Sequence, residues 1–128
     1  MIKVHNKIKL YVDDVRSAPP GWILAKTITE AIRILACFRV IEISLDHDIA
    51  YFDESGIFTG KVSNENFSSV AWFIANIPKK FRPKKVYIHT ANPTGAFALN
   101  DILKNKVNEI IRVIDYVNEW NNIKGKRK

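Results

Sequence analysis

The stretch Val40-Ile41-Glu42-Ile43-Ser44-Leu45-Asp46-His47-Asp48 joins an alternating apolar run to a charged triplet. The alternation of apolar and polar side chains from Val40 to Leu45 predicts a β-strand. The triplet Asp46-His47-Asp48 follows directly where that strand ends. In an open α/β sheet, ligands bind at the carboxyl ends of the strands. The triplet therefore indicates a functional edge of such a sheet.

Two other apolar runs end in the same way. Ile8 to Val12 alternates as a first strand and runs into Asp13-Asp14, and Val86 to His89 predicts a third strand that runs into Thr90-Ala91-Asn92-Pro93. The carboxyl ends of parallel strands share one edge of a sheet. Three polar clusters that are far apart in the sequence are therefore expected to meet at one small site.

Helical patterns separate these strands. Thr27-Ile28-Thr29-Glu30 has the spacing of a capping box and predicts a helix from about Thr27 to Phe38. Apolar spacing predicts a second helix over Asn64 to Ile77, and Thr94 can cap a third. Strands that alternate with helices indicate a mostly parallel, short sheet covered on both faces. The expected fold class is therefore α/β, as a three-layer α/β/α sandwich.

Two segments are less regular. Ala50 to Ser63 is a long polar stretch, and loops of this length tend to be lids or mobile segments. Ile110 to Val117 fits a strand and a helix, and we favour a fourth strand followed by a frayed or helical tail. We expect one domain over residues 1–120 and a flexible basic tail over residues 121–128.

The bulk composition suits one globular domain. The chain has 128 residues, of which 47% are hydrophobic, and its only cysteine, Cys37, excludes an internal disulfide. No segment resembles a signal peptide or a membrane span, so we expect a cytoplasmic protein without a membrane partner.

The formal net charge of +7 is partly concentrated in a loop before the third strand. Such a surface favours polyanions, so a weak contact with RNA is one interpretation and a purely solubilising role is the other. The cationic residues of this loop are Lys79, Lys80, Arg82, Lys84 and Lys85.

The acidic pair Asp13-Asp14 is suited to a hard cation such as Mg²⁺, which prefers carboxylates, water and substrate phosphate as ligands. The alternative is a turn whose carboxylates accept hydrogen bonds from backbone N–H groups. Arg16 could bind a phosphate in bidentate fashion, or could form an ion pair with the acidic pair.

The triplet Asp46-His47-Asp48 offers metal ligands, or a nucleophile with a general acid or base. Strand alternation places Asp46 and Asp48 on one side with Ser44, and His47 with the apolar face. The alternative is a capping Asp beside a core histidine.

The third cluster combines a strand-end histidine with the start of a helix, where backbone N–H groups favour phosphate. His89 could protonate a leaving oxygen, Asn92 could hold a phosphate oxygen, and Gly95 permits close approach. Ordinary capping and packing is the alternative. Trp22 could stack on a base, or could simply pack.

Taken together, these motifs resemble the family of cyclic-phosphate-processing receiver-like domains, a shortened and repurposed response-regulator receiver fold. The opening motif is Leu10–Arg16 with Pro20-Gly21-Trp22, the second is Ile43–Ile49, and the third is Ile88–Gly95. The similarity spans roughly residues 8 to 104. Only one helix separates the acidic pair from Asp46, so one strand–helix unit of an ordinary receiver is expected to be missing.

The resemblance implies roles for the motif residues. Asp46 stands where a receiver carries its phosphoacceptor, and a divalent Mg²⁺ or Mn²⁺ is the implied cofactor. The implied metal ligands are Asp13, Asp14 and Asp46; the catalytic groups are Asp46, His47, Asp48 and His89; and the phosphate-binding groups are Arg16, Thr90, Asn92 and Gly95.

The expected function is metal-assisted hydrolysis of a cyclic phosphate, either an RNA 2′,3′-cyclic end or a cyclic nucleotide signal. The resemblance implies a setting in RNA processing or in phage and bacterial conflict. Two alternatives remain. One is a non-catalytic module that binds or sequesters a nucleotide or RNA, and the other is a degenerate receiver that acts as a protein–protein switch.

Overall fold

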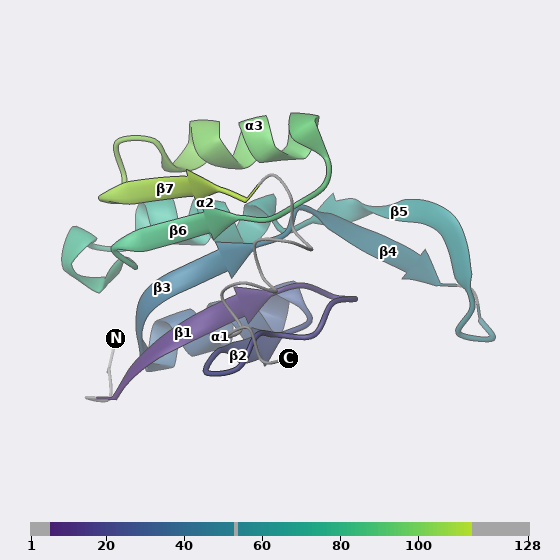
Figure 1. The fold of residues 1–128 in the computed structure, drawn as a ribbon, viewed down its shortest axis with the longest axis horizontal. Helices are drawn as coiled ribbons and strands as arrows, with labels where there is room; N and C mark the ends of the chain where they lie inside the picture. The colour runs from purple at the N-terminus through teal and green to yellow at the C-terminus, as the bar shows by residue number, and fades with distance from the viewer. Residues whose placement is uncertain (1–5, 53, 114–128) are drawn as a thin grey trace, which may run out of the picture.

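The computed structural model describes residues 6–52 and 54–113, and its centre is a sheet of five parallel strands (Figure 1). The strand order is β2-β1-β3-β6-β7. The strands are β1 (Lys7–Val12), β2 (Ile23–Ala25), β3 (Arg39–Leu45), β6 (Lys85–Ile88) and β7 (Glu109–Arg112). Counted within this sheet, the order is 2-1-3-4-5, which is the receiver order. The expected receiver-like α/β fold is therefore confirmed.

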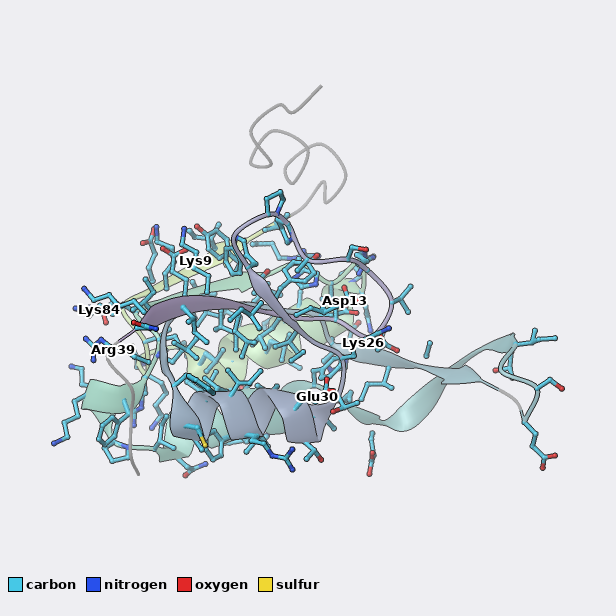
Figure 2. The ribbon with its side chains drawn as sticks, turned by 90° about the horizontal axis from the view of Figure 1, so that it is seen from below. Lys9, Asp13, Lys26, Glu30, Arg39 and Lys84 are labelled. Carbon is cyan, nitrogen blue, oxygen red and sulfur yellow. The ribbon has the colours of Figure 1, made fainter. Side chains whose placement is uncertain are left out.

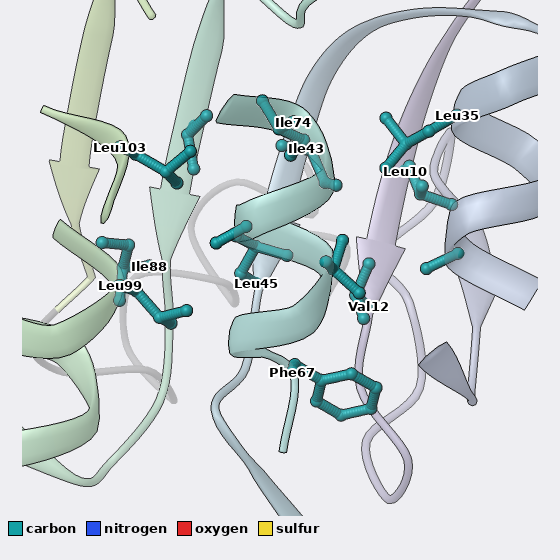
Figure 3. Packing of buried hydrophobic residues seen from close by; sticks show 14 of the residues in the cluster. Leu10, Val12, Leu35, Ile43, Leu45, Phe67, Ile74, Ile88, Leu99 and Leu103 are labelled. Atoms are coloured by element: carbon teal, nitrogen blue, oxygen red, sulfur yellow. The ribbon is translucent and has the colours of Figure 1, made fainter. Parts of the chain in front are cut away.

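Three helices lie side by side on one face of this sheet (Figure 3). They are α1 (Ile28–Cys37), α2 (Ser68–Asn76) and α3 (Pro93–Leu103). Alternate residues of each central strand face them, for example Leu10, Ile43 and Val86, and these side chains are buried with helix residues in one apolar cluster. This cluster is the main core, and its burial is the dominant favourable term in folding.

The other face of the sheet has a smaller apolar cluster. Tyr11 and Val113 are buried there, and the partly buried side chains packed on them are Ala18, Trp22, Leu24 and Tyr87. Among residues 6–52 and 54–113, no helix covers this face. The expected second layer of helices is not among these residues, and the residues 114–117 of the ambiguous segment and the tail 121–128 lie outside the described part of the chain.

The connection from β1 to β2 explains how the receiver fold is shortened. Residues 13–22 form an irregular loop at the place where the resemblance to receiver domains implied that a whole strand–helix unit is missing. The strand of that unit is present as β2, which pairs in parallel with β1. Only the helix is replaced by a loop, so the expectation was wrong about the strand.

The stretch expected to be a long lid loop is instead an antiparallel hairpin. Among the described residues, strands β4 (Asp48–Phe52) and β5 (Phe58–Asn66) pair only with each other, and they extend away from the five-stranded sheet (Figure 1). Because β5 continues to Asn66, α2 begins at Ser68 and not at Asn64 as expected. The hairpin starts at Asp48, which is the last residue of the charged triplet Asp46-His47-Asp48.

The remaining element boundaries follow local chemistry. Thr27 caps α1 by accepting a hydrogen bond from the Glu30 N–H at 3.0 Å, as the capping box predicted. The cap of α3 is Asn92 and not Thr94, because the Asn92 side chain accepts from the Thr94 N–H. The predicted fourth strand is confirmed as β7. Within the described part of the chain, no helix has the length and apolarity needed to cross a membrane.

Candidate functional site

The carboxyl ends of β1, β3 and β6 bring three polar residues together. Val12 pairs with Leu45, and Leu45 pairs with Ile88, so the residues that follow each of them are neighbours. The ladders continue one step further, because the Asp46 N–H donates to the Val12 carbonyl at 3.0 Å and the His89 N–H to the Leu45 carbonyl at 2.9 Å. The predicted convergence of Asp13, Asp46 and His89 is therefore present in the structure.

Asp13 is fully buried and accepts four hydrogen bonds. Its Oδ1 accepts from the N–H groups of Val15 and Arg16, both at 2.8 Å. Its Oδ2 accepts from Arg16 Nη1 at 3.0 Å and from His89 Nε2 at 2.9 Å. Burial alone would raise the pKa of Asp13, but these hydrogen bonds lower it to about 2. Asp13 is therefore ionised, and it also forms the turn that the alternative interpretation predicted.

His89 is fully buried, and both of its ring nitrogens are engaged. Nε2 bonds Asp13, and Nδ1 lies 2.7 Å from the hydroxyl of Ser44, which is also fully buried. The ring of Tyr11 stacks on the imidazole, with centroids 4.4 Å apart and an interplanar angle of 4°. Ser44 has no motif that predicts this role, although strand alternation places it on the side of Asp46.

Asp46 lies beside Asp13 and is almost fully buried. Burial and the negative charge of Asp13 raise the pKa of Asp46, and the His47 N–H, His89 and Arg16 oppose this only in part. Arg16 Nη1 lies 3.0 Å from Asp13 Oδ2 and 3.7 Å from Asp46 Oδ2. Burial lowers the pKa of Arg16, but the two carboxylates outweigh that effect and raise it. The guanidinium therefore bridges the two acids.

The same three residues have the chemistry of a cation site. One ligand atom from each of Asp13, Asp46 and His89 can be chosen so that all lie within 4.8 Å of one another. Carboxylates and an imidazole are ligand types of divalent ions such as Mg²⁺ or Mn²⁺. Both nitrogens of His89 are bonded in this structure, so Asp13 and Asp46 are the residues that would hold the ion. Asp14, which was expected to be a metal ligand, is not in this group of three. Its Oδ2 accepts a hydrogen bond from the Ala50 N–H at 2.7 Å and thereby anchors β4.

A second cluster lies beside the first, built on the start of the hairpin and of α3. His47 Nδ1 is 2.8 Å from Asp48 Oδ1, and the two side chains are 14% and 34% exposed. The amide of Asn92 donates to both oxygens of Asp48 at 3.4 and 3.3 Å. The hydroxyl of Thr90 in turn accepts from the Asn92 N–H at 3.2 Å. Thr90, Asn92 and Asp48 thus form a chain of contacts that ends on His47.

Gly95 makes room for His47. A Cβ at this position would lie 2.5 Å from Cγ of the His47 ring, which is closer than non-bonded atoms can approach. The absence of a side chain at Gly95 therefore allows the imidazole to pack against the first turn of α3.

Trp22 lies in the small cluster on the open face of the sheet. Its ring makes edge contacts with Tyr11 and Tyr87, with centroids 6.3 and 5.8 Å apart, and the Lys9 ammonium lies over it at 5.9 Å. These contacts favour the packing interpretation of Trp22 over base stacking.

A family model described as the cyclic-phosphate processing receiver domain matches residues 8–105, which include all three motifs. No curated protein and no solved structure matches the chain.

Proposed function

Because the chain belongs to the family of cyclic-phosphate processing receiver domains, we propose that it hydrolyses a cyclic phosphate with the help of a divalent cation. The observation that carries this proposal is the convergence of Asp13, Asp46 and His89 at the carboxyl edge of the sheet, with Arg16 between the two acids. RNA 2′,3′-cyclic ends and cyclic nucleotides both contain a cyclic phosphodiester, so either could be the substrate.

The charge at this edge supports the need for a cation. Asp13, Asp14, Asp46 and Asp48 all lie here, and Arg16 contacts two of them, Asp13 and Asp46. A cyclic phosphodiester carries a negative charge, so a cluster with this excess of carboxylates would repel it. A divalent ion held by Asp13 and Asp46 would reverse that repulsion and act as a Lewis acid on a phosphoryl oxygen.

Arg16 is suited to the phosphate itself. Its side chain is 29% exposed, whereas the carboxylates beneath it are nearly inaccessible. A guanidinium can donate two parallel hydrogen bonds to a phosphate. It would stabilise the charge that develops on the phosphoryl oxygens in the transition state.

His47 is the better acid–base candidate of the two histidines. Asp48 holds its Nδ1, so Nε2 is the nitrogen that can exchange a proton with substrate or water. Nε2 would take a proton from water as the water oxygen bonds to phosphorus. The same proton would then go to the ester oxygen whose bond to phosphorus breaks, and the product is a phosphomonoester.

His89 has a different role in this proposal. It is fully buried and its two nitrogens are occupied by Asp13 and Ser44, so it cannot reach a substrate without disrupting both contacts. His89 is therefore a positioning residue for Asp13. In the same way Asn92 positions Asp48, which orients His47.

The direct test is to incubate the protein with Mg²⁺ or Mn²⁺ and a panel of cyclic substrates, and to identify the products by mass. We expect one class of substrate to open to a phosphomonoester, and Asp46→Asn to abolish this turnover while it keeps the fold. Turnover that persists in Asp46→Asn would contradict the assignment.

One observation favours a second function. Arg16 already bridges Asp13 and Asp46, so the carboxylates are neutralised in part without a metal. A non-catalytic module that binds or sequesters a nucleotide would need only this partial neutralisation by Arg16, and no metal. Recovery of intact ligand with the wild-type protein, in the presence of either metal, would favour this function over hydrolysis.

A further inference from the structure

The edge of the sheet opposite the candidate site carries a basic groove. Two adjoining hollows lie between the start of β3, the 3-10 helix η1 (Lys79–Phe81) and the turn before β7, and the larger has a volume of about 390 Å³. Figure 2 shows Arg39 and Lys84 at the end of the molecule away from Asp13. The cations that line the basic groove are Arg39, Lys79, Lys80, Arg82, Lys84 and Lys106, and no carboxylate lines either hollow.

Arg82 fixes the shape of the basic groove. Its guanidinium donates to the carbonyls of Ile77 at 3.0 Å, Ala75 at 3.1 Å and Lys106 at 3.0 Å. These bonds tie the end of α2 to the turn before β7. Arg82 is therefore a structural cation. It holds in place the backbone that carries the other cations of the basic groove.

The other five cations are exposed and have no acidic partner. Within the described residues, none of them forms a salt bridge, although Lys80 lies over the ring of Phe81 at 5.3 Å. Positive charges held close together repel one another, and this repulsion is relieved when an anion binds. The spacing of several cations along one groove suits an anion with repeated charges.

The two edges of the sheet have opposite charge. The candidate site is rich in carboxylates, and the basic groove lies at the other end of the strands. Strand β3 runs from Arg39 to Leu45, next to Asp46, which corresponds to about 20 Å. A single cyclic nucleotide bound at Asp46 is too short to reach the groove, whereas a polynucleotide can contact both.

We propose that the basic groove binds the sugar–phosphate backbone of single-stranded RNA, so that the substrate is the cyclic-phosphate end of a polymer and not a free cyclic nucleotide. The choice of RNA rests on the proposed function, because a 2′,3′-cyclic phosphate needs the ribose 2′-hydroxyl. Lys and Arg contacts to phosphates are independent of sequence and weaken with salt.

A membrane fits the basic groove less well. Binding to a lipid surface uses apolar side chains that insert beside the cations. Among the described residues, no exposed large hydrophobic side chain lines either hollow. The cations instead surround a recess, which suits a chain of phosphates.

The first test measures binding alone, with a labelled RNA of roughly twelve nucleotides that ends in an ordinary 3′-hydroxyl. Lys84→Glu and Lys106→Glu should each weaken binding at low salt by roughly tenfold and lower the salt slope by about 1. Arg33→Glu, an equal change of charge on the exposed side of α1, is the matched control and should bind like wild type. Equal affinity of all three variants, or binding to anionic vesicles in place of RNA, would overturn the proposal.

The second test compares turnover of that RNA with a 2′,3′-cyclic end against a cyclic mononucleotide. The polymer should have the lower KM, and Lys84→Glu should remove this advantage without changing kcat for the mononucleotide. Equal kcat/KM for the two substrates would contradict the polymer-end assignment. A third outcome is RNA binding that depends on the groove, with no turnover of any substrate. That result would contradict the proposed hydrolysis but would still support RNA binding by the basic groove.

Discussion

Nε2 of His89 lies 2.9 Å from Oδ2 of Asp13, and both side chains are fully buried at the carboxyl ends of β6 and β1, which flank β3. The residues are 76 positions apart in the chain. Because a buried charge is costly unless it is paired and hydrogen-bonded, this contact stabilises the edge of the sheet as well as shaping the site. Residues that hold this edge and residues that would do chemistry should therefore respond differently to substitution.

Ser44→Ala should destabilise the protein. The substitution removes the buried hydroxyl that bonds His89 Nδ1 at 2.7 Å. The expected loss is about 1–3 kcal/mol in the free energy of unfolding. Urea denaturation measures it, and Ser69→Ala on the exposed side of α2 is the matched control. Equal stability of the two variants would show that the Ser44 contact contributes nothing.

Asp13 should make stability depend on pH in acid. Its folded pKa of about 2 lies below the ordinary value of 3.8, so the unfolded chain binds the proton more readily. The stabilisation is therefore fully present above the ordinary value and is lost as the pH falls towards 2. Its size is about 2 kcal/mol.

This dependence is measured by urea unfolding in metal-free buffer. The difference in unfolding free energy between wild type and Asp13→Asn should shrink as the pH falls from about 5 to about 2, because protonation removes the charge that the variant lacks. A difference that stays constant across this range would show that Asp13 is not held ionised by its partners.

His47→Gln should reduce catalysis with little effect on the fold. The side chain is partly exposed, and its assigned role is proton transfer through Nε2. Removal of a general acid or base lowers kcat by about 10²- to 10⁴-fold. His89→Gln should instead lower the unfolding free energy, because it disturbs two buried partners. If His47→Gln kept full kcat while His89→Gln remained folded and inactive, the two roles would be reversed.

Gly95→Ala should displace the His47 ring. The new Cβ would sit 2.5 Å from His47 Cγ, so the imidazole or the start of α3 must move. We expect a cost of about 1–3 kcal/mol in unfolding free energy, together with a loss of kcat. Combining Gly95→Ala with His47→Ala removes the clash. In a double-mutant cycle, the double variant should therefore lose less unfolding free energy than the sum of the two single variants. Additive effects would indicate that the close approach is not strained by a methyl group.

The sequence was sufficient to predict the parallel sheet, the first helix and the convergence of the three motifs. These features depend on local signals: alternation in the strands, a capping box at Thr27, and polar residues directly after apolar runs. The topology of parallel strands then places Asp13, Asp46 and His89 at one edge whatever the details of the helices.

Other features depended on contacts that a pattern does not reveal. Within residues 6–52 and 54–113, β4 and β5 pair only with each other and not with the central sheet, and their sequences lack the alternation that predicts a strand with one buried face. The division of labour between His47 and His89 follows from burial and from Ser44, which only the three-dimensional arrangement brings to Nδ1. The contact of Asp14 likewise depends on the hairpin, because its partner is the N–H of Ala50 in β4.

The central claim is that water opens a cyclic phosphate at the edge that contains Asp46. The most direct measurement is the reaction of a 2′,3′-cyclic RNA end in ¹⁸O-labelled water with Mg²⁺ or Mn²⁺, followed by mass analysis of the product. We predict a phosphomonoester that carries one labelled oxygen with the wild-type protein, and unreacted cyclic phosphate with Asp46→Asn. Unreacted cyclic phosphate with the wild-type protein, or the same labelled product from the variant, would contradict the claim.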